Sequence, residues 1–127
     1  MFDETLMKTA NALLEHCRNG TEDAGLVALY ADDAVSVEAL AMEGGMGPVF
    51  EGLEAIKGKH AWWNANTEVH SSSFDGPFFH GEDRFGVIFQ ADVTMKQSGE
   101  RWENMKELGL YTVKDGKIVR EEFYFSA

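Results

Sequence analysis

The hydrophobic pattern changes once along the chain, from a helical period before about residue 67 to a period of two after it. Apolar residues at helical spacing predict helices over residues 3–18, 22–30 and 52–66. Strands are expected at 35–40, 68–74, 84–97, 100–113 and 117–125. Helices gathered on one side of an antiparallel meander indicate an α+β fold. The 127 residues, with no linker or repeat, are expected to form one domain over residues 1–127.

Two short turns predict how the last three strands pair. Asp115-Gly116 is typical of a two-residue hairpin turn, and Ser98-Gly99 is expected to form another. Residues 41–52 and 75–83 are expected to be irregular connections. Counting outward from the turns places Val113 opposite Ile118, Leu108 opposite Phe123, and Phe89 opposite Leu108.

This register divides the sheet into two faces. The expected core face carries Phe85, Val87, Phe89, Leu108, Leu110, Val119, Phe123 and Phe125. The other face carries Ile88, Gln90, Asp92, Glu107, Tyr111, Arg120, Glu122 and Tyr124. That second face is expected to be exposed to solvent, to form a dimer interface or to line a polar pocket. A β-bulge in a strand would move the residues beyond it to the opposite face.

Composition excludes several classes of protein. The chain has 22 acidic and 11 basic residues, a formal charge of −11, which argues against nucleic acid or an anionic membrane as a partner. One cysteine, Cys17, rules out an internal disulfide and a thiolate metal cluster. There is no apolar run of membrane-spanning length, and the N-terminus does not have the pattern of a signal peptide. A cytoplasmic location is expected.

The segment YADDAVSVEAL, residues 30–40, places Glu38 in a predicted strand among apolar neighbours. An exposed strand residue is one interpretation. The other is a general base at the mouth of a pocket, where apolar surroundings raise the pKa of a carboxyl. The residues alone leave both open.

Two motifs resemble one known superfamily. The run LVALYADDAVSVE, residues 26–38, and the run YTVKDGKIVREEFY, residues 111–124, resemble the nuclear transport factor two-like superfamily, most closely its SnoaL-like and ketosteroid-isomerase-like branch. The resemblance implies a cone-shaped α+β domain, in which a curved antiparallel sheet wraps three N-terminal helices (a cystatin-like roll). It also implies a homodimer, a partly apolar pocket and no metal. This fold hosts many functions, so it does not specify one.

The resemblance also implies site residues. In the ketosteroid isomerases the catalytic aspartate stands four residues after the alanine of ADDA, which is the position of Glu38 here. Those enzymes stabilise the enolate with a tyrosine on the first helix and a protonated aspartate on a late strand. This chain has Leu13-Leu14 and Leu108-Gly109-Leu110 at those places, so steroid isomerisation is not expected. SnoaL-like cyclases use a late-strand acid, and Glu107 is the nearest match.

Other side chains complete the expected site. His70 or Glu107 is expected to act as a helper acid or orienting group, and Phe50, Trp63 and Phe89 to shape the pocket. Asp92, Tyr111 and Tyr124 are expected to contact a ligand if their face is internal. A hydrogen-bonded structural role for His70, and surface positions for Asp92 and Glu107, are the alternatives. No set of histidines and carboxylates has metal-binding spacing, and no cofactor is expected.

Together these features predict a protein that binds a small, mostly apolar molecule and acts as a cofactor-free isomerase or cyclase. In this hypothesis a carboxylate, Glu38, removes a proton beside a carbonyl group. A non-catalytic binding protein and a dimerisation module are the alternatives.

Overall fold

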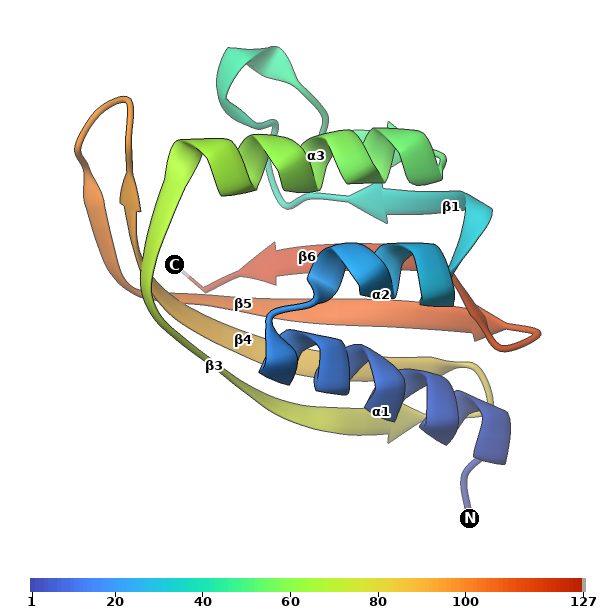
Figure 1. Ribbon diagram of the computed structural model, residues 1–127. Helices are drawn as coiled ribbons and strands as arrows, with labels where there is room; N and C mark the ends of the chain where they lie inside the picture. The colour runs from blue at the N-terminus through green and yellow to red at the C-terminus, as the bar shows by residue number, and fades with distance from the viewer. Residues whose placement is uncertain (127) are drawn as a thin grey trace.

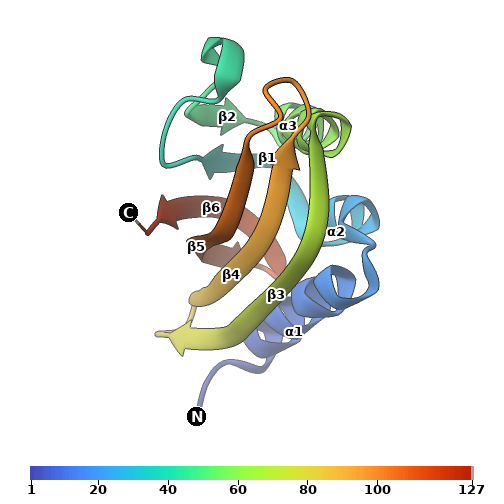
Figure 2. The same cartoon turned by 90° about the vertical axis from the view of Figure 1, so that its left-hand side faces the viewer.

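Three helices lie on one side of a curved six-stranded sheet that does not close into a barrel (Figures 1 and 2). The structure is a computed structural model that describes residues 1–126, apart from the side chain of Glu43. The helices are α1 (Glu4–Asn19), α2 (Glu22–Leu29) and α3 (Leu53–Asn66). The strands are β1 (Tyr30–Val37), β2 (Val49–Glu51), β3 (Thr67–His80), β4 (Arg84–Met95), β5 (Arg101–Lys114) and β6 (Lys117–Phe125). The predicted α+β cone is confirmed.

The sheet has the strand order β2-β1-β6-β5-β4-β3. β1 runs parallel to β6, while every other neighbouring pair is antiparallel, so the sheet is mixed rather than wholly antiparallel as predicted. The crossover through α3 carries the chain from the β2 edge to the β3 edge. β1 therefore lies beside the C-terminal strand, and residues near 36 come next to residues near 121.

Local signals in the sequence define the ends of α1. The backbone N–H of Leu6 donates to Oδ1 of Asp3 at 2.8 Å, which satisfies one of the free amides of the first turn. Gly20 ends the helix with φ +68°, a left-handed conformation that glycine adopts without a steric penalty.

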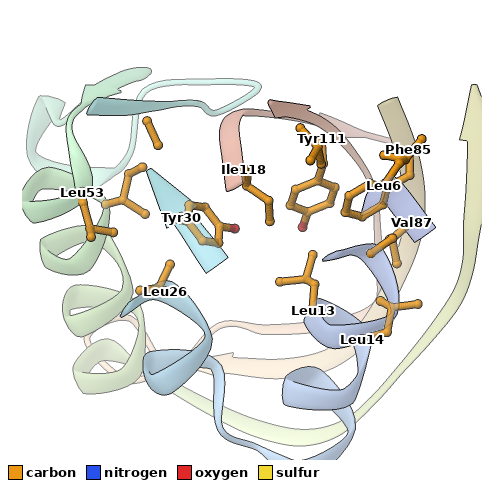
Figure 3. Close-up of a cluster of buried hydrophobic side chains, with 14 residues drawn as sticks. Leu6, Leu13, Leu14, Leu26, Tyr30, Leu53, Phe85, Val87, Tyr111 and Ile118 are labelled. Atoms are coloured by element: carbon orange, nitrogen blue, oxygen red, sulfur yellow. The ribbon is translucent and has the colours of Figure 1, made fainter. Parts of the chain in front are cut away.

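The helices bury their apolar faces against the inner face of the sheet. Leu6, Leu13 and Leu14 of α1 meet Phe85 and Val87 of β4, and Ile56 of α3 is fully buried (Figure 3). Phe85 and Tyr111 stack with ring centroids 4.8 Å apart. The core also includes Leu53 and Ile56 of α3, and Phe50 and Phe123 pack against it.

The hairpin between β5 and β6 has the predicted turn. Asp115 and Gly116 have φ of +52° and +77°, and Val113 pairs with Ile118. One residue later the register shifts, because Thr112 pairs with Arg120 and leaves Val119 as the extra residue of a bulge. Leu108 consequently pairs with Tyr124, and the predicted pairing of Leu108 with Phe123 is wrong.

The predicted hairpin turn at Ser98-Gly99 is also wrong. β4 ends at Met95 and β5 starts at Arg101, so the connection is longer than two residues. A second bulge shifts the register between Ala91 and Val93. Phe89 therefore pairs with Glu107 instead of Leu108.

These two bulges correct the predicted faces. On β4, Phe85, Val87 and Phe89 point inward as expected. On β5 the assignment is reversed, because Tyr111 is buried in the core while Leu108 is 37% exposed on the outer face. On β6, Ile118, Glu121 and Phe123 face inward in place of Val119. Glu107 shares the inner face with Gly109 and Tyr111, since the three alternate along β5.

Two segments predicted to be irregular contain strands. Val49–Glu51 form β2, which pairs with β1 through Phe50 and Ser36. β3 continues to His80, so most of the predicted 75–83 connection is strand. β1 begins at Tyr30 and ends at Val37, which places Glu38 directly after the strand rather than within it.

Candidate active site

Glu38 continues the alternation of β1 beyond the end of the strand. Ser36 faces inward and is fully buried, so Glu38, two residues later, projects to the same side. The backbone N–H of Glu38 donates to the carbonyl oxygen of Pro48 at 2.8 Å, which fixes the chain there. The Glu38 side chain is 16% exposed, and its Oε1 lies 2.7 Å from Nζ of Lys59.

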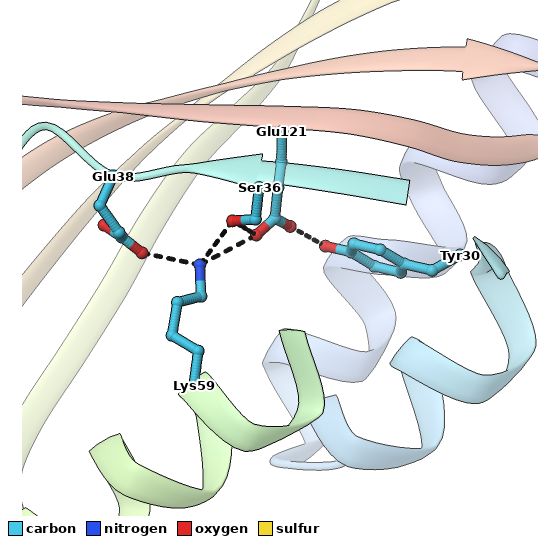
Figure 4. Close-up of polar contacts among 5 residues, drawn as sticks. All are labelled: Tyr30, Ser36, Glu38, Lys59 and Glu121. Atoms are coloured by element: carbon cyan, nitrogen blue, oxygen red, sulfur yellow. Dashed lines mark hydrogen bonds and ion pairs between the residues drawn. The ribbon is translucent and has the colours of Figure 1, made fainter. Parts of the chain in front are cut away.

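Lys59 is a buried lysine on α3. It lies three residues after Ile56, which itself lies three after Leu53, so the three share the helix face that packs on the sheet. Its side chain is 7% exposed. The ammonium donates to Ser36 Oγ at 2.6 Å, to Glu38 Oε1 at 2.7 Å and to Glu121 Oε2 at 3.2 Å (Figure 4). Each of its three N–H groups thus has an acceptor, which offsets the cost of removing the charge from water.

Glu121 lies at the inner end of this network. Its side chain is 1% exposed, and it is brought to Ser36 by the pairing of β1 with β6. One carboxylate oxygen accepts from the hydroxyl of Tyr30, and the other accepts from Ser36 Oγ at 2.6 Å and from Lys59. Burial and the adjacent carboxylate raise the pKa of Tyr30 well above its ordinary value, so the phenol stays a neutral donor.

Aromatic rings surround the charged groups. The ammonium of Lys59 lies 4.8 Å from the ring centroid of Phe123 and 5.6 Å from that of Phe50. Gly109 leaves room for the rings of Phe89, Tyr111 and Phe123. A Cβ built on this glycine would lie 3.0–3.2 Å from a carbon of each ring. The inner face here is therefore both apolar and charged.

Glu107 lies on the inner face of β5, next to this cluster. Burial and the charge of Glu38 raise the pKa of the Glu107 carboxyl from 4.5 to about 7, and Glu121 adds to the rise while Lys59 opposes it. Near neutral pH the site thus holds a carboxylate, Glu38, paired with Lys59, and beside it a carboxyl group that is about half protonated. Such a pair can accept and donate protons in one reaction.

A hollow of about 340 Å³ opens where β6 ends. Its lining consists of Val37, Glu38, Ala39, Glu122, Phe123, Tyr124 and Phe125. A neighbouring hollow of about 260 Å³ extends to the outer face of the sheet, since its lining includes Ile88, Leu108 and Tyr124 as well as Glu107 and Phe125. Glu38 therefore borders the first hollow and Glu107 the second, and a small molecule can reach each of these two carboxyl groups.

The predicted site residues divide into two groups. Glu38, Glu107, Phe50 and Phe89 belong to the charged and aromatic region around Lys59. Tyr124 lines the hollow, although it is 48% exposed on the outer face. Trp63 is half-buried and lies one turn after Lys59 on the same face of α3.

The remaining predicted residues lie elsewhere. His70 is exposed on β3, and its Nε2 lies 2.7 Å from Thr94 Oγ1. Three strands separate β3 from β1, or about 19 Å at the usual strand spacing. Asp92 pairs with Arg101, which lowers the pKa of that carboxyl. Tyr111 is a core residue that stacks on Phe85.

Comparison with known proteins agrees with this fold. The family model of the SnoaL-like domain matches residues 14–125. The chain belongs to the SnoaL-like family. The chain is 41% identical in sequence to a protein from Mesorhizobium loti whose crystal structure is known. That protein has the provisional name SnoaL-like polyketide cyclase, with "carbohydrate phosphatase" in brackets. It superposes with a TM-score of 0.84 over 93% of this chain and 97% of the other.

Two more distant structures share the fold. An NTF2-like protein of unknown function from Burkholderia pseudomallei has a TM-score of 0.76 at 18% identity, with 97% and 92% of the two chains covered. A protein from Catenulispora acidiphila with a ketosteroid isomerase-like fold, in complex with trimethylamine, has a TM-score of 0.70 at 22% identity, with 93% and 85% covered. A search of proteins of curated function found no match.

The sequence analysis of this SnoaL-like domain missed Lys59 as a site residue. The available signal was its position, because a lysine on the buried stripe of an amphipathic helix requires an acidic partner. The adjacent pair Glu121-Glu122 indicated that one carboxylate faces inward, but the bulge at Val119 decides which one. Tyr30 and Ser36 gave no signal beyond their burial.

Two further properties of the described residues bear on the site. No helix within residues 1–126 is long and apolar enough to cross a membrane. The same residues contain no group of three or more histidine, cysteine, aspartate or glutamate side chains placed to hold a metal ion.

Proposed function

We propose that this SnoaL-like domain binds a small, mostly apolar carbonyl compound and moves a proton beside the carbonyl, as an isomerase or cyclase. One observation carries the proposal. Glu38 binds the buried ammonium of Lys59, Glu107 lies near enough for the charge of Glu38 to raise its pKa, and each of the two carboxyl groups borders a hollow beside aromatic rings. A purely structural ion pair has no need of the additional carboxyl group, which destabilises the folded protein when it ionises.

The two carboxyl groups have different roles in this proposal. Glu38, which is paired with Lys59, removes a proton from the carbon next to the carbonyl. The electron pair of the broken C–H bond forms the enolate. In a β,γ-unsaturated carbonyl compound the enolate is a conjugated dienolate, and Glu107, with a pKa of about 7, donates its proton to the γ-carbon, so that the C=C bond moves next to the carbonyl. Glu38 then releases its proton and Glu107 takes one up through solvent, which restores the starting state.

The lining of the site supports an apolar substrate. Phe50, Phe89 and Phe123 pack against the core and surround the charged groups. Their rings exclude water, which strengthens the interactions of the remaining charges. The provisional name of the Mesorhizobium loti relative, a polyketide cyclase, is consistent with proton abstraction beside a carbonyl.

Hydrogen exchange tests the proposal without knowledge of the true substrate. A panel of cyclic ketones and 1,3-dicarbonyl compounds is incubated with the protein in D₂O, and loss of the α-proton signal is followed by proton NMR. We expect exchange of at least one compound above the buffer rate. Glu38→Gln should abolish this exchange, whereas Glu103→Gln, an exposed change on β5, should leave it intact.

Other outcomes lead to different conclusions. Saturation transfer from the protein to a compound without exchange would indicate a binding protein that is not catalytic. Exchange that persists in Glu38→Gln would show that another group removes the proton. If no compound of the panel binds and none exchanges its α-proton, the proposal is overturned.

We also propose that the protein forms a homodimer through the outer face of its sheet. Cross-strand pairing places apolar side chains side by side on that face: Phe78, Ile88, Leu108, Leu110 and Tyr124. Three of them are at least 37% exposed, and a continuous apolar surface of this kind is typical of an interface between proteins. Light scattering tests this. Leu108→Glu should give monomers, and Lys57→Glu on α3 should not.

A further inference from the structure

Proton abstraction beside a carbonyl places negative charge on the carbonyl oxygen, and this oxygen needs a partner. The hydroxyl of Tyr30 already donates to Glu121, and Tyr111 stacks in the core. Neither stands where the enolate would form. The donors that the ketosteroid isomerases use are replaced by leucine and glycine at the corresponding positions. The stabilising group must therefore come from elsewhere in this chain.

The contacts of Lys59 differ on the two sides of its ammonium. On the inner side lie Ser36 and Glu121, which are 0% and 1% exposed and are held by each other and by Tyr30. On the outer side lies Glu38, which is 16% exposed and borders the hollow. Figure 4 shows Glu38 on one side of the amine and the other three residues on the opposite side. The contact with Glu38 is thus the one that a ligand can replace.

The chemistry of the step loosens that same contact. When Glu38 takes a proton it becomes a neutral acid, and its attraction for the ammonium falls. At that moment the negative charge has moved to the carbonyl oxygen of the substrate. Lys59 then faces a neutral carboxyl group and a new oxyanion in the same hollow.

We infer that Lys59 is the catalytic electrophile of this site, and that it exchanges its contact with Glu38 for the enolate oxygen as the proton moves. This inference rests on the proposed function. The C–H bond of the substrate breaks, its electron pair forms the C=C bond, and the π electrons of the carbonyl move to oxygen. The proton goes to Glu38, and Lys59 keeps all of its protons throughout. The faces of Phe50 and Phe123 limit the movement of the ammonium, since both rings lie within 5.6 Å of it.

The exchange of partners gives a test that does not depend on turnover. Glu38→Gln mimics the protonated acid, so in this variant the ammonium should be free to bind an oxyanion. The probe is 4-nitrophenol, whose phenolate oxygen resembles an enolate oxygen and whose two ionisation states have different visible spectra. Binding is titrated at about pH 6, well below the pKa of about 7 of the Glu107 carboxyl, because Glu38→Gln removes one of the charges that raise this pKa and the group must stay mostly protonated.

We expect Glu38→Gln to bind the probe as the phenolate about tenfold or more tightly than the unaltered protein, a smaller gain than the roughly 100- to 1000-fold that one oxyanion donor contributes in a transition state. Adding Lys59→Met to Glu38→Gln should remove this gain and leave the bound probe as the neutral phenol. Lys59→Arg should retain part of the phenolate signal. Lys57→Met, an exposed change on the same helix, is the matched control.

Several results would overturn the inference. One is a bound probe that stays neutral in Glu38→Gln. Another is equal phenolate binding with and without Lys59. If the Lys59→Met variants do not fold, the affinity of Glu38→Gln for the phenolate, compared with that of the unaltered protein, decides the question. A purely structural role of Lys59 predicts no gain in this affinity. Phenolate binding without α-proton exchange would refute the proposed function and keep Lys59 as an oxyanion site, whereas exchange without a phenolate preference would refute only the role of Lys59.

Discussion

Replacing Glu107 by glutamine should change how the stability of the protein depends on pH. The pKa of this carboxyl rises from 4.5 to about 7 on folding, because burial and the charge of Glu38 disfavour the ionised form. Below pH 4.5 the group is protonated in both states and has no effect. As pH rises from 4.5 through 7, the unfolded chain releases the proton more readily, so the folded state loses stability.

The size of this effect follows from the shift. At 1.36 kcal/mol per pH unit, the full loss is about 3 kcal/mol, and about 2 kcal/mol of it falls between pH 5.5 and 8.5. A neutral glutamine removes the titration. The free energy of unfolding of Glu107→Gln, relative to the unaltered protein, should therefore rise by about 2 kcal/mol over that range.

Urea unfolding of both proteins at pH 5.5 and 8.5 measures the difference. Glu103→Gln is the control, since this exposed residue of β5 carries the same change in charge without the burial. A difference between Glu107→Gln and the unaltered protein that is the same at both pH values would refute the reasoning. A direct carbon-13 titration of the Glu107 carboxyl should give a midpoint near 7.

Two further changes test the packing of the site. Glu121→Gln should cost about 3 kcal/mol in urea unfolding, because it leaves the buried ammonium of Lys59 without one carboxylate; a loss below about 1 kcal/mol would contradict the buried ion pair. Gly109→Ala should lower the free energy of unfolding by about 1–3 kcal/mol, because its Cβ would press on three aromatic rings. Its control is Gly58→Ala on α3, where the Cβ meets nothing within 4 Å and the change should stabilise the helix by about 0.5–1 kcal/mol. Equal effects of the two alanines would show that the rings do not crowd Gly109.

Features of the fold that depend on neighbouring residues could be read from the sequence. The helical period predicted the three helices, and Asp3 and Gly20 end α1 as their conformational preferences indicate. The Asp115-Gly116 pair predicted both its turn and the pairing of Val113 with Ile118. Each of these predictions rests on interactions within a few residues, where the sequence determines the geometry.

Features that depend on irregularities of the sheet could not be read in this way. The bulge at Val119 has no turn residue or proline to mark it, yet it moves Glu121 and Phe123 to the inner face, and the shifted pairing of β4 with β5 places Tyr111 there as well. Because the side-chain period of a strand is two, a single extra residue reverses every assignment beyond it. The prediction that Tyr111 and Glu107 share a face with Glu122 failed for this reason, because the first two face inward and Glu122 pairs with Leu110 on the outer face.

The charged network around Lys59 also depends on residues that are far apart in the sequence. In the helix pattern Lys59 is one polar residue on an apolar stripe, and in the strand pattern Glu121 is one of two adjacent glutamates. Neither pattern predicts the other, because the two residues meet only when β1 pairs with β6 and α3 packs across them. Once they meet, one ammonium binds the carboxylates of Glu38 and Glu121, and burial together with the charge of Glu38 raises the pKa of the nearby Glu107 carboxyl to about 7. The base and the acid of the proposed reaction are therefore a consequence of this charge balance, which no local stretch of the sequence contains.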